Sequence, residues 1–231
     1  MFWFDTRDVM GDKVRMKILP VAALIVLVVS SGCSDPTDKV HKSAASEPVK
    51  TETAPSTVAV KEFVVRTPES KIGFVGSKVT GKHDGGFKNF AGTINVVDGK
   101  MVASSVIRIN MKTTWSDNEK LTGHLTSADF FDVAQYPAAT FTTTSIEPAG
   151  DHSNVVGNLE LHGVTKSISF PAKIEVSADA VSVEADFAIN RKDFNINYPG
   201  KSNDLIRDNV ALQLAIKATP GPSRPEDQIT N

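Results

Sequence analysis

The chain of 231 residues contains a single cysteine, Cys33, so it cannot form an internal disulfide. It also lacks a surplus of positive charge: its formal net charge is −2. The sequence therefore gives no electrostatic basis for binding nucleic acid. The longest apolar run, residues 18–29, covers about a dozen residues and is too short to span a bilayer comfortably. There is no glycine-rich phosphate loop and no Gly-x-Ser-x-Gly motif, so the sequence shows no signature of a nucleotide site or a serine hydrolase.

Cys33 ends a segment that is typical of an exported protein. Residues 16–33, MKILPVAALIVLVVSSGC, combine a basic start, an apolar core and small residues ahead of the cysteine. The approach to the cysteine through Ser31 and Gly32 resembles a bacterial lipoprotein signal, in which the thiol is acylated and becomes the new N-terminus. A signal peptide without lipid and an uncleaved anchor are the alternatives. We expect a signal segment over residues 1–32 and lipidation of Cys33.

The residues around this segment refine the expected start and location. Asp5, Asp8 and Asp12 precede Met16, and an acidic stretch is unusual ahead of an apolar leader, so Met16 is predicted to be the true start. Ser34, rather than aspartate, follows the cysteine, which in Gram-negative sorting favours the outer membrane. The expected location is the periplasmic side of the cell envelope. Attachment to the membrane would come from the acyl chains, of which more than one is needed for a stable hold.

Composition divides the rest of the chain into a tether, one domain and a tail. Residues 33–60 are rich in serine, threonine, alanine, proline and charge, and nothing in them can bury a core, so a disordered tether is expected. Residues 219–231 are interrupted by proline and glycine and are also expected to be unstructured. The globular domain is therefore placed at residues 61–218.

Alternation of apolar and polar residues dominates this domain. In VSVEADFAI, every second side chain is apolar, as expected for a strand with one buried face. Similar segments recur with short connections, which favours an antiparallel sheet. After a short lead-in, EFVVR, eight long strands are predicted at residues 71–80, 88–97, 104–112, 138–147, 155–161, 166–176, 181–189 and 210–218. Eight such strands can close into a lipocalin-like barrel, whose interior is filled by side chains or holds one small ligand.

Turn and helix signals fall between these strands. Asp98-Gly99 is a strong hairpin signal, and GKHDGGF, residues 81–87, is interpreted as another turn region. Residues 116–132 break the alternation, and SDNE at residues 116–119 matches a capping box at the start of a helix. We therefore expect a short helical insertion at about residues 116–132.

The stretch HLTSADFFDVAQYPAATF, which begins at His124, has the residue types of an active site. His124, Asp129 and Asp132 could bind a metal or act as an acid–base set. The spacing of His124 and Asp129 does not match the one-face geometry of a His-Glu-x-x-His zinc helix, and the adjacent Phe130 and Phe131 require burial. The favoured interpretation is a helical cap over one end of the barrel, with gating of the interior as an alternative. No catalytic residue is assigned.

The other histidines and a basic loop carry weaker signals. His83, His152 and His162 fall near three different turns, and no spacing indicates that they share a metal, so no metal site is predicted. Residues 191–208 form a long connection in which basic and acidic residues alternate. The connection is either a solvated loop or the place where a few basic residues meet a polar or anionic headgroup. The headgroup candidates are Arg191, Lys192, Lys201 and Arg207.

Several segments resemble the YceI-like polyisoprenoid-binding family. They are KIGFVGSKV at residues 71–79, FKNFAGTINV at 87–96, LTGHLTSADFFDVAQYPAATF at 121–141, GNLELHGVTKSISFPAKI at 157–174 and INRKDFNI at 189–196. The resemblance spans nearly the whole domain, with one departure at Asn195, where the family often has glycine. It implies a lipocalin-like antiparallel barrel that is exported, has no catalytic activity and needs no cofactor. Its elongated apolar interior would hold a long isoprenoid chain, such as a quinone or a polyprenyl lipid.

The alternation and the resemblance together predict which residues face this lipid. Gly73, Gly76, Gly92 and Gly157 are expected to leave room for it, although glycine also marks barrel bends. The predicted tunnel wall consists of Ile72, Phe74, Ile94, Ile107, Ile109, Met111, Leu159, Leu161, Ile168, Phe170, Val183, Phe187, Leu212 and Leu214.

Two other functions stay open at this point. A barrel packed solid with its own side chains would make the protein an envelope interaction lipoprotein whose loops contact partners. An enzyme acting on a lipid would use His124 or a carboxylate at the open end of the barrel. Alternation alone does not separate a packed core from an apolar tunnel. It also leaves open which lipid is bound and whether the domain forms a homodimer.

Overall fold

A computed structural model gives the structure of residues 35–50 and 59–221. The predicted signal segment, the start at Met16 and the lipidation at Cys33 lie outside these described residues. Within them, no helix combines the length and the apolar character that crossing a membrane requires.

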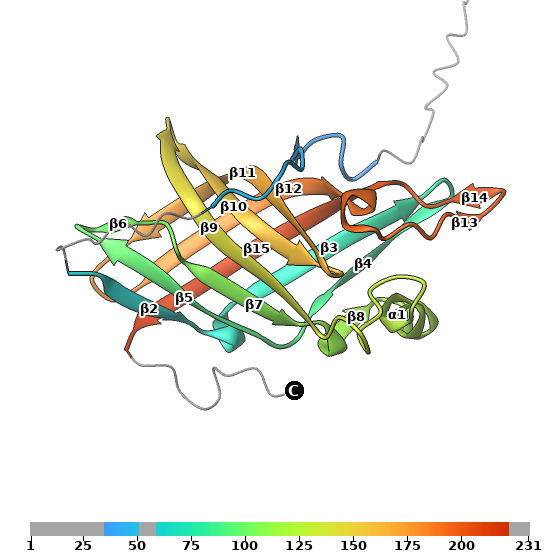
Figure 1. Ribbon diagram of the computed structural model, residues 1–231, viewed down its shortest axis with the longest axis horizontal. Helices are drawn as coiled ribbons and strands as arrows, with labels where there is room; N and C mark the ends of the chain where they lie inside the picture. The colour runs from blue at the N-terminus through green and yellow to red at the C-terminus, as the bar shows by residue number, and fades with distance from the viewer. Residues whose placement is uncertain (1–34, 51–58, 222–231) are drawn as a thin grey trace, which may run out of the picture. The chain divides into compact units, whose positions relative to one another are not determined.

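The described chain is mostly β-structure with one α-helix, α1, at Glu119–Thr126 (Figure 1). The strands are β1 (His41–Lys42), β2 (Lys61–Val65), β3 (Lys71–Lys78), β4 (Gly81–Phe87), β5 (Phe90–Val97), β6 (Lys100–Met101), β7 (Val106–Asn110), β8 (Thr114–Ser116), β9 (Ala138–Ala149), β10 (His152–Leu161), β11 (Val164–Val176), β12 (Val181–Asn190), β13 (Gly200–Lys201), β14 (Asp204–Leu205) and β15 (Asn209–Pro220). Short 3-10 helices are η1 (Thr67–Glu69), η2 (Met111–Thr113) and η3 (Arg191–Phe194).

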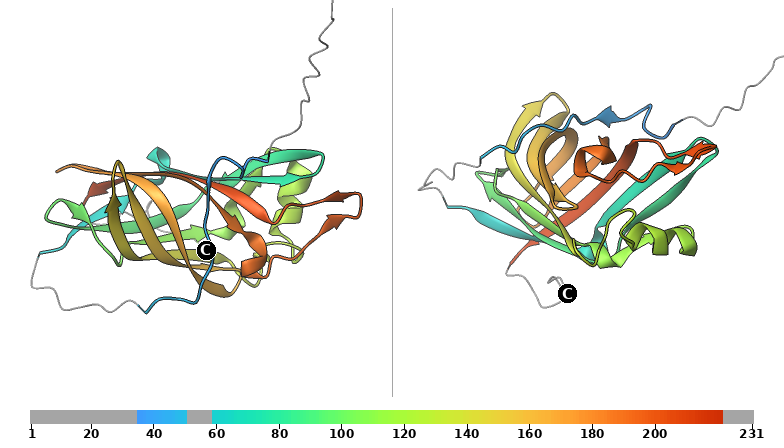
Figure 2. Two further views of the ribbon diagram at one scale, coloured as in Figure 1. Left: turned by 90° about the horizontal axis from the view of Figure 1, so that it is seen from above. Right: turned by 45° about the vertical axis from the view of Figure 1, so that its right-hand side comes forward.

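Eight strand positions form the predicted closed antiparallel barrel (Figures 1 and 2). β9, β10, β11, β12 and β15 each fill one position. Each of the other positions is built from two consecutive segments, β2 with β3, β4 with β5, and β7 with β8. The ring closes where β12 pairs with β15, from Val181↔Ala218 to Asn190↔Asn209. Each predicted long strand corresponds to a strand of this barrel.

Two segments differ from the predicted strand pattern. The EFVVR lead-in is part of the barrel itself, because β2 pairs with both β5 and β15. The segment GKHDGGF is not a turn region but strand β4, paired with β3 and β8. The glycines of this segment explain why the strand was not predicted, and one of them is needed for its packing. They break the alternation, yet a Cβ at Gly85 would lie 2.3 Å from the ring of Phe74, so only glycine lets that ring lie against β4.

The turn and helix predictions are confirmed in outline and corrected in detail. Asp98 and Gly99 both have positive φ, 49° and 73°, as a type I′ hairpin turn requires. The helical insertion is present, but Asn118 rather than Ser116 caps α1, since its side chain accepts a hydrogen bond from the amide of Leu121. β15 continues through Pro220, so the unstructured tail predicted from residue 219 begins too early.

Residues 35–50, expected to be a disordered tether, lie along the barrel wall; we call them the strap (Figure 1, blue). β11 and β12 pair only between residues 173–176 and 181–184, so a seam separates the rest of the two strands. β1 pairs in parallel with β12 beside this seam. Ser46 exchanges two backbone hydrogen bonds of 2.9 Å with Ser167 of β11. The expectation of disorder is therefore wrong for the strap.

Polar contacts fix the strap at both of its ends. The side-chain amide of Asn158 accepts a hydrogen bond from the backbone N–H of Val49 (2.9 Å) and donates one to the backbone carbonyl of Val49 (2.7 Å). At the other end, the carboxylate of Asp35 lies 3.2 Å from the guanidinium of Arg207, and Thr37 is fully buried. Composition does not reveal this docking, because the strap is held by backbone and polar hydrogen bonds to the barrel rather than by an apolar core of its own.

Candidate functional site

The barrel contains an elongated apolar cavity that opens toward the end carrying α1, β13 and β14. Its volume is about 430 Å³, within the ~300–1,000 Å³ of pockets that bury drug-sized molecules. Along β15, Val210, Leu212, Leu214 and Ile216 all line the cavity, and the strand segment from Val210 to Ile216 spans ~20 Å. The cavity therefore suits an extended apolar chain better than a compact polar molecule.

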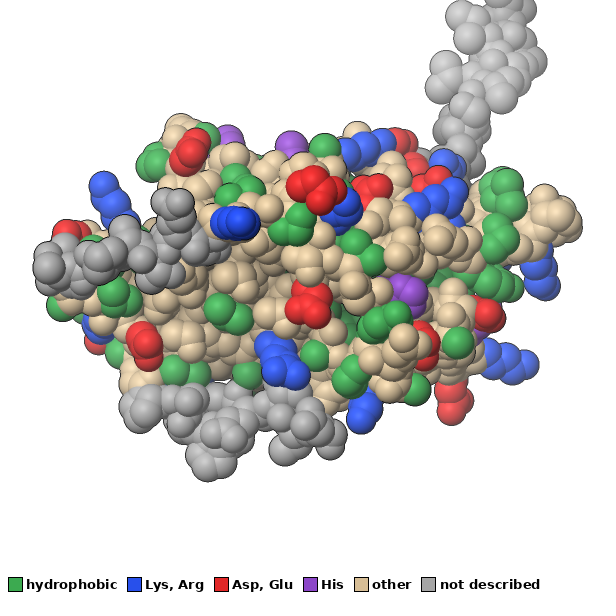
Figure 3. Space-filling model, in the orientation of Figure 1, with side chains coloured by type: hydrophobic (Ala, Val, Ile, Leu, Met, Phe, Trp, Pro, Cys, Tyr) green, Lys and Arg blue, Asp and Glu red, His purple; other side chains and the backbone are tan. Residues whose placement is uncertain are grey.

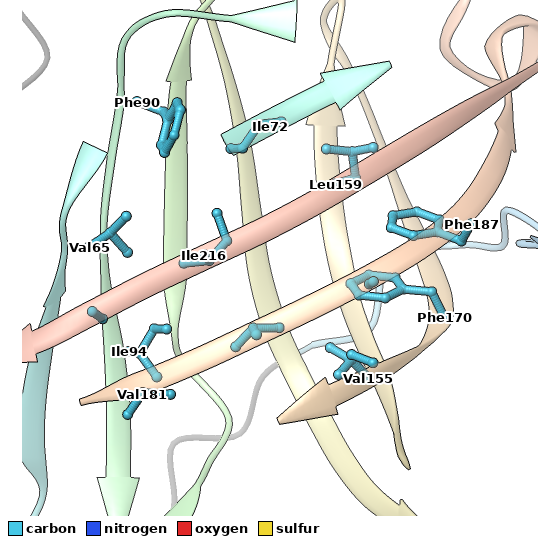
Figure 4. Close-up of a cluster of buried hydrophobic side chains, with 14 of the residues drawn as sticks. Val65, Ile72, Phe90, Ile94, Val155, Leu159, Phe170, Val181, Phe187 and Ile216 are labelled. Atoms are coloured by element: carbon cyan, nitrogen blue, oxygen red, sulfur yellow. The ribbon is translucent and has the colours of Figure 1, made fainter. Parts of the chain in front are cut away.

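Most of the predicted tunnel wall faces this cavity, with Ile94 and Val183 as the exceptions. These two residues lie toward the other end of the barrel, in a cluster with Phe63, Val65 and Val181, whose side chains are almost fully buried. None of these five side chains lines the cavity, and Figure 4 shows Ile94 and Val181 close together, away from Phe170 and Phe187. The cavity thus stops short of this cluster, so the cavity and the fully packed core occupy opposite ends of one barrel.

Aromatic rings line the middle of the cavity. Phe170 and Phe187 stack face to face, with centroids 4.1 Å apart and planes 3° from parallel (Figure 4). Phe141 packs against Phe170 at 5.5 Å. The sequence prediction missed Phe141, and also Ile189 and Ile216, although the last two lie on the apolar faces that the alternation identifies.

Of the glycines predicted to leave room for a ligand, Gly76 is the one that does so. It lines the cavity, and a Cβ at this position would have no atom within 4 Å. At Gly157 a Cβ would lie 2.4 Å from the ring of Phe141, and at Gly92 it would lie 2.3 Å from a backbone carbonyl oxygen. Gly73 is in ordinary contact with its neighbours and does not line the cavity. Gly92 and Gly157 therefore make room for the barrel's own atoms.

The stretch that begins at His124 forms part of a cap at the mouth of the cavity. Leu125 and Phe130 are buried in a cluster with Phe74, which matches the predicted cap. The His124 ring also lines the cavity, edge-on to Phe130 and Tyr198 at centroid distances of 4.9 and 4.8 Å. The aromatic residues of this stretch therefore serve to cover the open end.

Two histidines at the mouth, His124 and His83, are each paired with an aspartate. His124 Nε2 lies 2.9 Å from the Asp129 carboxylate, and His83 Nδ1 lies 2.8 Å from that of Asp117. Burial opposes ionisation of Asp117, but the N–H of Asp84 and the His83 ring together hold its pKa below its usual value. Within residues 35–50 and 59–221, no three groups of metal-ligating type come together.

The other two histidines lie at hairpins, His152 as the first residue of β10 and His162 in the turn that follows this strand. His152 contacts the carboxylate of its neighbour Asp151 at 3.0 Å. His162 has a positive φ of 51° in the hairpin between β10 and β11, and its Nδ1 lies 3.2 Å from the carbonyl oxygen of Phe194. Neither His152 nor His162 lines the cavity.

The basic loop after β12 is organised mainly by internal contacts. Arg191 is buried and donates to three backbone carbonyl oxygens, at 2.5, 3.1 and 3.5 Å. Burial lowers its pKa, against the opposing effect of Asp208. Lys192 pairs with the same Asp208 at 2.9 Å, and Arg207 is engaged by the strap. Of the four headgroup candidates, Arg191 and Lys201 line the cavity. Of these two, Arg191 is buried and Lys201 is exposed.

Asn195 keeps the conformation that glycine would supply. It ends η3 with φ 58° and ψ 18°, in the left-handed region. Asparagine tolerates this region better than most residues. The departure from the pattern at Asn195 therefore leaves the local turn intact.

A clasp at the mouth joins two loops that are far apart in the sequence. The ammonium group of Lys78 pairs with the carboxylate of Asp204, which also accepts hydrogen bonds from the backbone N–H and the hydroxyl of Thr80 at 3.1 and 3.0 Å. This clasp holds β14 to the hairpin between β3 and β4. Lys78 and Asp204 both line the cavity, so the clasp forms part of its rim.

The clasp is expected to weaken only at acidic pH. The Lys78 ammonium and the Thr80 donors hold the pKa of Asp204 below its ordinary value. A lowered pKa means that the stabilisation is complete above the ordinary value of about 3.9 and is lost as the pH falls through the lowered pKa. The Thr80 amide resonance, followed by NMR, should therefore titrate below pH ~3.9. Asp204→Asn should abolish this titration, and an inflection at or above the ordinary value would contradict the assignment.

Known proteins are similar to this barrel in sequence and in fold. The sequence model of the YceI-like domain matches residues 63–218. Protein YceI of Salmonella arizonae and that of Salmonella paratyphi B are each 38% identical over 119 residues, which cover 48% of this chain and 62% of theirs. The match to these curated relatives thus spans less than two thirds of their length.

Solved structures agree on the architecture. BcnA of Burkholderia cenocepacia superposes with a TM-score of 0.62 at 24% identity, over 67% of this chain and 99% of its own. A polyisoprenoid binding domain from Saccharophagus degradans, implicated in plant cell wall breakdown, gives a TM-score of 0.58 at 18% identity, over 71% and 100%. At these identities the likeness establishes the fold. Because the family's sequence model covers the whole barrel from β2 to β15, the chain belongs to the YceI-like family.

Proposed function

We propose that this protein binds one long-chain isoprenoid lipid, of the quinone or polyprenyl type, inside its barrel. The observation that carries the proposal is the elongated apolar cavity, which stops short of the packed cluster at one end of the barrel and has polar residues at the other. Moving an apolar chain from water into such a site is favourable by about 25 cal/mol per Å² and needs no directional contacts along the chain. The Saccharophagus degradans domain, which has the same fold and is a polyisoprenoid binding domain, supports this class of ligand.

The distribution of polar groups gives the bound lipid a direction. Most polar side chains that line the cavity, among them Lys78, His83, His124 and Lys201, belong to the mouth, whereas the middle is lined by aliphatic and aromatic residues. The hydrocarbon tail would extend past the Phe170–Phe187 stack toward the packed end. The headgroup would stay at the mouth, where hydrogen-bonding groups and water are available.

The proposed role is to bind or carry the lipid, without a catalytic step. We also propose, from the sequence, that the protein is exported and held on the periplasmic side of the envelope by an acylated Cys33, with the outer membrane favoured. The volume of the cavity weighs against the alternative of a barrel packed solid with its own side chains.

Organic extraction of the purified full chain tests the proposal directly. Mass spectrometry of the extract should detect an isoprenoid lipid that is absent from a mock purification. Protein stripped of lipid should then take up a fluorescent polyprenyl or quinone lipid presented in detergent, with saturation at about one molecule per barrel. Repeated recovery of empty protein that also fails to take up the presented lipid would overturn the proposal.

A further inference from the structure

Two exposed apolar side chains stand together at the rim of the cavity. Val79, in the turn between β3 and β4, is 61% exposed, and Leu205 of β14 is 51% exposed. The backbone N–H of Val79 donates to the carbonyl of Leu205 at 3.2 Å, so the two loops form one surface, which we call the tip. Figure 2 shows the two loops side by side at the end that carries α1. Gly76, Lys78 and Ile206 of the same loops line the cavity, so the tip adjoins its opening.

Exposed lysines flank the tip, whereas Asp204 and Asp35 are paired with Lys78 and Arg207, and the exposed Asp84 lies two residues after Lys82 on β4. Lys82 of β4 and Lys201 of β13 are exposed, and within the described ranges neither has an ion-pair partner. Figure 3 shows apolar and basic side chains at the end of the molecule over β13 and β14. Lysines beside exposed apolar side chains suit the boundary of a bilayer with anionic lipids, where the ammonium groups meet phosphates and the apolar groups enter the acyl region.

The strap begins beside the tip, at Asp35. Asp35, at the start of the described chain, pairs with Arg207, which follows the tip residues Leu205 and Ile206. Only two residue steps separate Cys33 from Asp35, a span of at most ~7 Å. An acylated Cys33, which belongs to the proposed function, would therefore hold the tip close to the membrane, whereas a disordered tether would let it drift away.

We propose that the tip is a docking surface for an anionic lipid bilayer, and that it places the cavity mouth against the membrane so that the lipid passes between bilayer and barrel without crossing water. A bilayer fits better than a protein partner. Two exposed apolar side chains fall far short of the ~1,200 Å² of total surface that a stable protein interface buries. They are sufficient to enter the headgroup region when lysines flank them.

Fluorescent probes test the docking independently of lipid uptake. Each full-length protein carries Cys33→Ser and one new cysteine, Val79→Cys or Leu205→Cys, labelled with an environment-sensitive dye. Val60→Cys is the matched control, since Val60 is 48% exposed and precedes β2 at the packed end of the barrel. On vesicles of phosphatidylcholine with phosphatidylglycerol, the dye emission should shift to the blue at positions 79 and 205 but not at 60. Equal shifts at all three positions, or none, would overturn the proposal.

A loading assay tests the route of the lipid. Val79→Asp/Leu205→Asp should slow the uptake of a fluorescent polyprenyl lipid from the same vesicles at least tenfold and leave uptake from detergent unchanged. The control Val49→Asp/Val60→Asp, which changes two other exposed valines, should load from both sources at the wild-type rate. Unchanged loading of the tip variant from vesicles would refute the docking role. Failure of the unsubstituted protein to take up lipid from detergent would instead refute the proposed function. The dye shifts at positions 79, 205 and 60 would still show whether the tip binds the bilayer.

Discussion

Replacing Gly76 with phenylalanine is expected to abolish uptake of the isoprenoid lipid while the barrel stays folded. Gly76 shares the inner face of β3 with Ile72 and Phe74, lines the cavity, and has open space where its Cβ would be. A phenylalanine ring can therefore occupy the path of the lipid without displacing an atom of the barrel. We expect the affinity to fall by about two orders of magnitude, or ~3 kcal/mol, in a titration with lipid presented in detergent.

Gly123→Phe is the matched control for this substitution. Gly123 lies exposed on α1 and does not line the cavity, and a Cβ at this position would also have no atom within 4 Å. The Gly123 variant should bind the lipid as the wild type does. Urea unfolding should show that both variants are folded. Undiminished binding by a folded Gly76→Phe variant would show that the lipid does not pass through this mouth.

Gly157→Ala is expected to produce a large loss of stability from a single methyl group. The new Cβ would lie 2.4 Å from the ring of Phe141 and 2.6 Å from the carbonyl oxygen of Thr142. The ring can tilt, but the carbonyl belongs to the paired strand β9 and cannot move without disturbing the ladder. Overpacking of this kind costs about 1–3 kcal/mol, and the backbone clash places Gly157→Ala at the upper end. The measurement is the midpoint of urea unfolding of the lipid-free protein.

Gly76→Ala separates this clash from the general effect of replacing glycine. Its Cβ would meet no atom within 4 Å, so the variant should be as stable as the wild type or slightly more stable, because alanine restricts the unfolded chain. A Gly157→Ala variant that matches Gly76→Ala in stability would disprove the close packing between β9 and β10.

The alternation of residue types was sufficient to locate the barrel strands. Segments such as residues 181–189 expose one polar face and bury one apolar face, and this pattern is set by the two-residue period of the strand itself. The hairpin at Asp98-Gly99 was predictable for a similar reason, since positive φ at both positions is a local property of these residue types. The resemblance of whole segments then specified the family.

The strand β4 and the strap could not be predicted in this way. β4 contains three glycines and no alternation, and it is a strand because β3 and β8 pair with it on either side. The strap has the composition of a linker. Its order depends on the backbone groups left unpaired along the seam between β11 and β12, to which Ser43 and Ser46 bind. Both features are consequences of partners distant in the sequence.

The sequence by itself determined the class of fold, the family and the set of residues from which the interior is built. Only the tertiary structure decided which of these residues enclose free volume. Ile94 and Ile107 belong to equally apolar segments, yet Ile94 is buried in the packed end and Ile107 lines the cavity. The physical reason is that strand alternation fixes the face on which a side chain lies, whereas its depth along the barrel, and the volume that opposing side chains leave unfilled there, depend on all eight strand positions together.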